Sequence, residues 1–427
     1  MSRRHELTHP RDAIMRTMER IYRYRMTTTS GGNISILDDE GDLWITPARL
    51  DKGALRREDI VRVLKDGTIE GPHKPSSEYP FHRAIYEARP DLRGIVHAHP
   101  VALVAFSICR QVPDTQISRQ ARRVCGKVGF APYALPGSEA LGRNIAGTFA
   151  EGFDCVVLEN HGVVVGGADL TEAFERFETL EFTAKTIIKA RILGPVRPLI
   201  GDEERPRAEA AGTPAPHKPT SHEKELRRQL CEFVRRSYQQ RLMISTQGAF
   251  SARLEGDAFL ITPHRVDRQS LEVDDIVLVR DGIPEAGKVP SGSARNHRAI
   301  YLKHPAFQSI VNAYPVNATA FSITDAPFDS RTIPESFLFL RDVARVPAGV
   351  QLGDGTALAD LVSPTHPISI LANDGVQVCG TTVLDAFDRL EVLEATAEAM
   401  IGGRSLGEVH IMGDAAIDEL KAAFKLQ

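Results

Sequence analysis

Length, composition and charge indicate an ordinary globular protein. The chain has 427 residues, 25% charged and 42% hydrophobic, with a formal net charge of −4. This length suggests two or three domains with sizeable cores, and the charge argues against nucleic acid as the main partner. No apolar run could span a membrane, no secretory signal is present, and five scattered cysteines form no C-x-x-C pair, so we expect a cytoplasmic protein without disulfides.

In chain order, the first half predicts alternating helices and strands, which is typical of an α/β domain. The apolar spacing predicts a helix over 11–25, a strand over 44–46, a helix over 77–89 with a serine cap at Ser77 and Pro80 in its first turn, a strand over 94–100, two strands around a turn at 160–162, and a helix over 170–192. Neither a Walker A motif nor a G-x-G-x-x-G fingerprint occurs, so nucleotide binding has no support.

The second half repeats the first. Residues 95–108 read IVHAHPVALVAFSI and residues 310–323 read IVNAYPVNATAFSI, with nine of fourteen positions identical. Other collinear matches, such as HRAIY and ITP, keep an offset of 213 to 216 residues. A period this long indicates a duplicated domain and not a solenoid. We therefore expect a domain over 1–193, a linker rich in Pro, Ala and charge over 194–221, and a second domain over 222–427.

Three histidines of the first copy indicate a metal site. His97 and His99 are two residues apart in an apolar strand, so their imidazoles point to the same face, and His161 lies in the predicted turn. Three imidazoles with an open fourth position are typical of a catalytic divalent metal, usually zinc, although cobalt, manganese or iron would also fit. Alone, an H-x-H pair is more often structural. Here all three histidines are lost together in the second copy, where the counterparts are Asn312, Tyr314 and Asp374.

Glu78 is the candidate acid/base. Its place at a helix start also suits a capping-box acid, but its counterpart is Ser293, so it is lost with the histidines and is better interpreted as catalytic. His82, in contrast, is kept as His297 and is therefore interpreted as structural. The glycine- and hydroxyl-rich turns TSGGNIS (29–35) and PSSE (75–78) could bind an anion or be ordinary turns.

The first half, over about 11–192, resembles the class II aldolase/adducin domain family. The resemblance rests on SGGNIS, ITP, PSSEYPFHRAIY, VHAHP, PYALPGSEAL and ENHG, in that order. It implies two tandem three-layer α/β/α domains, each with a central β-sheet flanked by helices, of which the second is degenerate. It also implies one zinc or other divalent ion per chain, on the three histidines.

The resemblance implies further site residues and an assembly. Glu78 would be the acid/base and Tyr133 a proton donor supplied by a neighbouring subunit. An anionic group of the substrate would contact Thr29, Gly32, Asn33, Ser76 and Ser77. This chain reads TPAR where family aldolases have TPSG, so Arg49 is added as an anion ligand, or the substrate carries a carboxylate or no phosphate at all. A homo-oligomer is expected, in which two tandem chains would mimic a ring of four domains.

The resemblance leaves several activities open. Our first expectation is an aldolase-type lyase that cleaves a C–C bond of a small hydroxy-ketone or sugar phosphate through an enediolate. A decarboxylase, epimerase or dehydratase acting on a sugar acid or sugar phosphate is the main alternative. A non-enzymatic, adducin-like interaction module explains the second half better than the first, and a purely structural metal site leaves the open ligand position unexplained.

Overall fold

A computed structural model describes residues 7–201 and 217–426. The chain divides into two compact units: most of residues 7–185 form the first, and 186–426, with the short segment 117–119, form the second. Residues 202–216 of the expected linker lie outside the described residues, so its bounds stay a prediction. Within the described residues, none of the helices has the length and apolar character needed to cross a membrane.

The first half is an α/β domain with one mixed eight-stranded sheet, in the order β4-β3-β2-β1-β5-β8-β7-β6. All neighbouring strands are antiparallel except β6 and β7, which are parallel. The elements are α1 (Pro10–Arg23), β1 (Asn33–Leu37), β2 (Leu43–Ile45), β3 (Val61–Val63), β4 (Ile69–Glu70), α2 (Tyr79–Ala88), β5 (Gly94–Ala98), α3 (Val101–Ile108), α4 (Arg119–Cys125), β6 (Val128–Ala131), α5 (Glu139–Ala150), β7 (Cys155–Leu158), β8 (Gly162–Gly167) and α6 (Leu170–Leu193).

The second half repeats this arrangement, with the sheet order β12-β11-β10-β9-β13-β16-β15-β14 and again one parallel pair, β14 and β15. Its elements are α7 (Ser221–Gln239), β9 (Ala249–Arg253), β10 (Ala258–Ile261), β11 (Val277–Arg280), β12 (Ile283–Pro284), α8 (Ala294–Lys303), β13 (Ser309–Ala313), α9 (Val316–Ser322), α10 (Pro334–Leu340), β14 (Val343–Val346), α11 (Thr356–Asp360), β15 (Ile368–Leu371), β16 (Gly375–Gly380), α12 (Val383–Leu406) and α13 (Asp414–Phe424). The identical strand order confirms the α/β fold and the tandem duplication.

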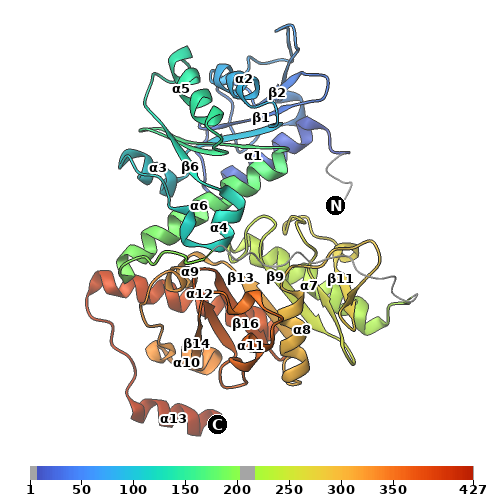
Figure 1. Cartoon of the computed structure of the whole chain (residues 1–427), viewed down its shortest axis with the longest axis vertical. Helices are drawn as coiled ribbons and strands as arrows, with labels where there is room; N and C mark the ends of the chain where they lie inside the picture. The colour runs from blue at the N-terminus through green and yellow to red at the C-terminus, as the bar shows by residue number, and fades with distance from the viewer. Residues whose placement is uncertain (1–6, 202–216, 427) are drawn as a thin grey trace. The chain divides into compact units, whose positions relative to one another are not determined.

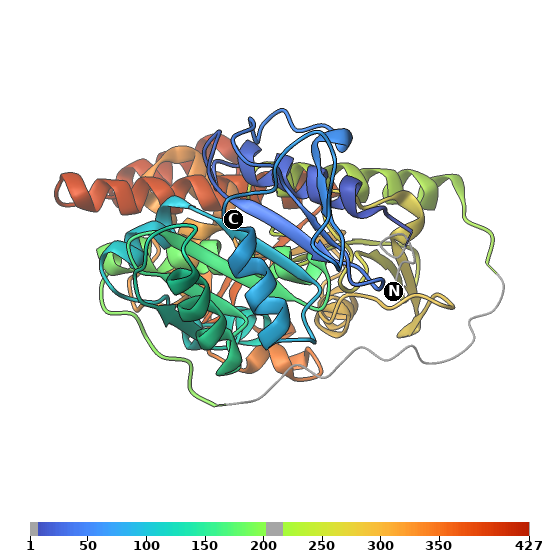
Figure 2. The same cartoon turned by 90° about the horizontal axis from the view of Figure 1, so that it is seen from above.

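Helices cover the first sheet. Every residue of β5 and β8 is buried, as expected for strands covered on both faces. One face packs against α2 and α5, which lie side by side (Figure 1) and bring Phe81, Ile85 and Phe149 into a core with Ile95 and other strand residues. The long helices α6 (green) and α12 (red) follow the last strand of each half (Figure 2).

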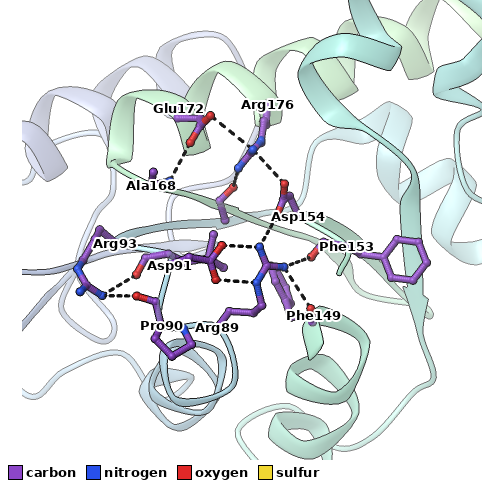
Figure 3. A network of polar contacts seen from close by, with 12 residues as sticks. Arg89, Pro90, Asp91, Arg93, Phe149, Phe153, Asp154, Ala168, Glu172 and Arg176 are labelled. Atoms are coloured by element: carbon purple, nitrogen blue, oxygen red, sulfur yellow. Dashed lines mark hydrogen bonds and ion pairs between the residues drawn. The ribbon is translucent and has the colours of Figure 1, made fainter. Parts of the chain in front are cut away.

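A polar network ties these elements together at the end of the sheet opposite the histidines (Figure 3). The Arg89 guanidinium pairs with Asp91 and Asp154 at 2.7 and 2.9 Å and donates to the carbonyls of Phe149 and Phe153. Asp154 also pairs with Arg176 of α6 at 2.9 Å. The network therefore joins the end of α2 to α5, β7 and α6, which fixes the frame that carries the site.

The predicted elements are found with small shifts in their bounds, and one cap was wrong. Helix α2 begins at Tyr79 with Glu78 as its N-cap, so Ser77 lies one residue further out, in the exposed turn. Pro80 is in the first turn as expected. The strands over 33–37, 61–63 and 128–131 and the helices over 101–108, 119–125 and 139–150 were not predicted, because their patterns are short or uniformly apolar.

Candidate metal and acid/base site

The three predicted histidines lie together in the first half. The Nε2 atoms of His97 and His99 are 3.2 Å apart, and the His161 ring lies 4.9 and 5.0 Å from those of His97 and His99. One nitrogen from each ring falls within 4.8 Å of the others. His97 Nδ1 lies 2.9 Å from the Val163 carbonyl and must donate to it, which leaves the Nε2 lone pair for a ligand. This donor set fits a divalent metal such as zinc.

Tight backbone packing brings the rings together. The turn between β7 and β8 places Asn160 at φ 52°. A Cβ on Gly162 would lie 2.6 Å from the Ala98 carbonyl oxygen and from the His99 ring, and a Cβ on Gly31 would lie 2.9 Å from His99 Nδ1. Both positions therefore need glycine because the backbone passes directly against the His99 side chain.

A buried serine, which the sequence analysis missed, anchors the His161 turn. Ser107 Oγ donates to the Leu158 carbonyl at 2.6 Å and accepts the His161 backbone N–H at 3.0 Å. Helix α3 is thereby joined to both ends of the turn. The sequence gives little indication of this role, because Ser107 lies in an apolar helix and its counterpart in the other copy, Ser322, is also a serine.

Glu78 faces the triad. Its carboxylate oxygens lie 3.2 Å from His97 Nε2 and 3.4 Å from His161 Nε2, and Asn33 Nδ2 donates to it at 2.7 Å. The side chain makes no hydrogen bond to the helix N-terminus, which excludes the capping-box interpretation. The carboxylate thus lies against the ring nitrogens of two of the three imidazoles.

Charges at this site favour an ionised acid and two neutral imidazoles, while the Glu78 carboxylate outweighs burial and raises the pKa of His97. Burial would raise the pKa of Glu78, but the neighbouring His97 imidazole outweighs burial and holds that pKa well below its usual range. Burial and the repulsion from His97 lower the pKa of His99 to about 3 and that of His161 to about 4. At neutral pH these two rings are uncharged, which is the form that binds metal.

The candidate anion-binding residues fall into two groups. Asn33 and Ser76 are buried and hydrogen-bonded beside Glu78, since Ser76 Oγ accepts the Glu78 backbone N–H at 3.3 Å. Thr29, Ser77 and Arg49 are exposed on neighbouring turns. Gly32 takes φ 74°, and a Cβ there would lie 2.7 Å from the His97 carbonyl oxygen, so its role in the structure is a close backbone approach. Arg49 has φ 57°, a left-handed conformation that favours glycine.

Lys52 adds a buried charge that the sequence analysis did not single out. Its ammonium group donates to the Pro47 carbonyl at 2.8 Å, and its backbone N–H donates to Thr29. Burial lowers its pKa to about 8. Lys52 therefore joins two of the turns expected to contact an anion.

Tyr133 does not join the triad. It follows β6, its side chain is 56% exposed, and its backbone N–H donates to Glu159 at 2.9 Å. Within the described chain, no recorded contact of the histidines involves Tyr133.

Comparison with known proteins decides the family. The model of the "Class II Aldolase and Adducin N-terminal domain" matches residues 12–188 and again 228–401. The chain belongs to the class II aldolase/adducin family. Both halves are family domains, so the tandem arrangement is confirmed, and this family typically uses a divalent metal.

Relatives in the class II aldolase/adducin family carry two kinds of name. A 3-oxo-tetronate 4-phosphate decarboxylase of Pectobacterium atrosepticum is 39% identical over 184 residues, which are 41% of this chain and 82% of that protein. An L-fuculose phosphate aldolase of Methanococcus maripaludis is 35% identical over 39% of this chain and 88% of its own length. The crystal structure of the L-fuculose-1-phosphate aldolase of Thermus thermophilus aligns with 43% of this chain and 96% of its own, at 25% identity and a TM-score of 0.38.

The second family domain has a different set of side chains at the corresponding place. Asn312 and Asp374 are buried, Asp374 accepts a hydrogen bond from Gln351 at 3.0 Å, and Ser293 stands at the Glu78 position. Among the described residues of both halves, the histidine triad is the one group of three or more His, Cys, Asp or Glu side chains close enough to share a metal ion.

Proposed function

We propose that the chain is a divalent-metal-dependent lyase, with zinc as the expected ion, that acts on a small hydroxy-carbonyl compound. It would break the bond between the carbon beside the carbonyl and the next carbon. The observation that carries this proposal is the ionised Glu78 carboxylate, held 3.2 and 3.4 Å from two of three convergent imidazoles. An acid/base beside a three-histidine metal site is the minimum machinery for such a reaction.

The site residues would have separate roles in the reaction. A metal ion on His97, His99 and His161 would polarise a carbonyl and stabilise negative charge on oxygen. Glu78 would accept or return the proton at the carbon beside that carbonyl, since it is ionised and within reach of the same position. The exposed turns with Thr29, Ser77 and Arg49 would contact an anionic end of the substrate.

Two bond cleavages suit this arrangement. Aldol cleavage is the first, and the Methanococcus relative is named for it. Decarboxylation of a 3-oxo acid is the second, and the Pectobacterium relative, at 39% identity, favours it. Both reactions leave an enediolate that must be protonated on carbon, so both need the same acid/base.

Glu78→Gln tests the proposal because it keeps the shape of the side chain and removes its proton exchange. Turnover of L-fuculose phosphate or of 3-oxo-tetronate 4-phosphate should fall at least about 100-fold. The matched control is Glu87→Gln, an exposed carboxylate on the same helix, which should keep full turnover. Wild-type activity retained in Glu78→Gln would contradict the assignment.

Tyr133 is proposed to serve a neighbouring copy of the chain. Its exposed ring is not placed to exchange a proton at its own triad, but it is available to a second subunit, where it would take the proton that the substrate hydroxyl loses when an aldol C–C bond breaks. The second half, which has no triad, would then act as a scaffold in a homo-oligomer. A solution mass equal to a single chain would count against this assembly.

A further inference from the structure

A chain of hydrogen bonds leads from the core to Glu78. The Tyr86 hydroxyl lies 2.9 Å from Ser35 Oγ, Ser35 Oγ lies 2.7 Å from His82 Nδ1, and His82 Nε2 contacts Asn33 Oδ1. Asn33 Nδ2 then donates to Glu78 at 2.7 Å. Asn33 lies directly opposite His97 on the neighbouring strand, so the chain ends beside the triad.

The direction of each hydrogen bond in this chain follows from Glu78. The Asn33 amide nitrogen donates to the Glu78 carboxylate, so the amide oxygen is the group that faces His82. His82 Nε2 must therefore carry a proton and donate. Its Nδ1 must then accept the Ser35 hydroxyl proton. His82 is fully buried, and burial together with the repulsion from His97 lowers its pKa to about 3, so the neutral ring with one fixed tautomer is the form present at neutral pH.

The second half keeps the start of this chain and changes its end. His297 has the same partners, Ser251 Oγ at 2.7 Å and, through it, Tyr301. Its Nε2, however, lies 2.6 Å from Asn312 Oδ1. Asn312 is the counterpart of His97, and the residue opposite it is Ala249. The amide that contacts the histidine is therefore on β13 in the second half and on β1 in the first. It has no acid to hold, because Ser293 replaces Glu78.

We propose that His82 is a positioning residue for the first half: it fixes the Asn33 amide, and that amide holds the Glu78 carboxylate over the histidine triad. This inference rests on the proposed function and deepens it. Retention of the histidine in both halves shows that it also supports the fold. Its action on Glu78 is specific to the half that has both Asn33 and the acid.

The test compares His82→Leu with His297→Leu in the full chain, with zinc as the probe. Both variants lose the same serine contact in similar surroundings, so both should be destabilised to a similar extent. Because the Glu78 carboxylate would lie beside the bound cation and attract it, a displaced Glu78 should weaken zinc binding. The zinc dissociation constant, measured by chelator competition, should rise at least tenfold in His82→Leu and stay within twofold of wild type in His297→Leu. His82→Gln, whose amide can replace the Nε2 donor, should restore most of the affinity.

Asn33→Ala separates positioning from folding. Ala249 occupies this position in the second half, where Asn312 supplies the amide to His297 instead. Asn33→Ala keeps the Ser35–His82 contact, so it should disturb folding less than His82→Leu does. If His82 acts through Asn33, Asn33→Ala should weaken zinc binding as His82→Leu does, and the double variant should be no weaker than either single one. Additive losses, or zinc affinity unchanged in His82→Leu, would overturn the inference. A wild-type chain that binds no zinc would instead remove the proposed function beneath it.

Discussion

At the scale of single residues, Ser107 gives the most direct prediction. Ser107→Ala would remove the hydroxyl that bridges the His161 N–H and the Leu158 carbonyl, which would keep only their mutual hydrogen bond at 3.2 Å; this should cost about 1 kcal/mol of stability and weaken metal binding. Ser322→Ala is the matched control, because that hydroxyl bonds only to Thr319 in its own helix. Urea unfolding and zinc titration of both variants check this. Equal zinc affinity in the two variants would show that Ser107 does not position His161.

The sequence alone located the residues of the triad, but not Ser107 and His82, which hold the site residues in place. The comparison of His97, His99 and His161 with the second copy predicted a shared site, because a whole ligand set is lost together. That same comparison could not separate His82 from an ordinary core residue, since its counterpart His297 is identical. What distinguishes His82 is its partner across the strand pair, and a change of partner becomes visible only when the strand register is known.

At the scale of elements, the long helices α6 and α12 each hold the start of a short helix. Glu181 accepts the Leu103 N–H at 3.3 Å, and Glu394 accepts the N–H groups of Asn317 and Ala318 at 2.9 and 2.8 Å. Glu181 pairs with Lys185 at 3.1 Å. The counterpart of that lysine is Glu398, and burial, with Glu398 adding to it, raises the pKa of Glu394 to about 7.

This difference predicts a pH dependence that Glu394 contributes to the stability of the second half. Because the pKa of Glu394 is raised on folding, its protonated form stabilises the fold at acid pH, and that contribution is lost as pH rises through about 7. Glu394→Gln keeps a neutral hydrogen-bond acceptor. Its free energy of unfolding, relative to that of wild type, should rise by about 2 kcal/mol between pH 5 and pH 8. Urea unfolding at both pH values measures this, with Glu181→Gln as a control that should change less. A constant difference between Glu394→Gln and wild type would contradict it.

Strands and helices were predictable to different extents. The helix over 170–192 was confirmed almost to the residue, because it is long and regularly patterned. Short strands such as β3 and β6 were missed, since three or four residues carry too little periodicity. The cap of α2 was misplaced by one residue because Ser77 suits the N-cap chemically, whereas the fold uses Glu78 there and directs its carboxylate to the triad.

At the scale of the whole molecule, one family domain appears twice with different side chains at equivalent places. The sheet order is the same in both halves, so the frame does not depend on a metal ligand set. Two of the residues that replace the histidines in the second half are buried with a hydrogen-bond partner. Asn312 accepts from His297, and Asp374 accepts from Gln351. This supports a division of labour in which the first half carries the chemistry and the second half serves as scaffold.

The metal content of the purified chain, measured beside that of His97→Ala, tests the central claim most directly. We expect about one divalent ion per chain in the wild type and close to none in His97→Ala, because His97 is the fully buried ligand at the centre of the triad. Two ions per chain would show that the second half has a site of its own. No ion after reconstitution with zinc would contradict the proposed lyase.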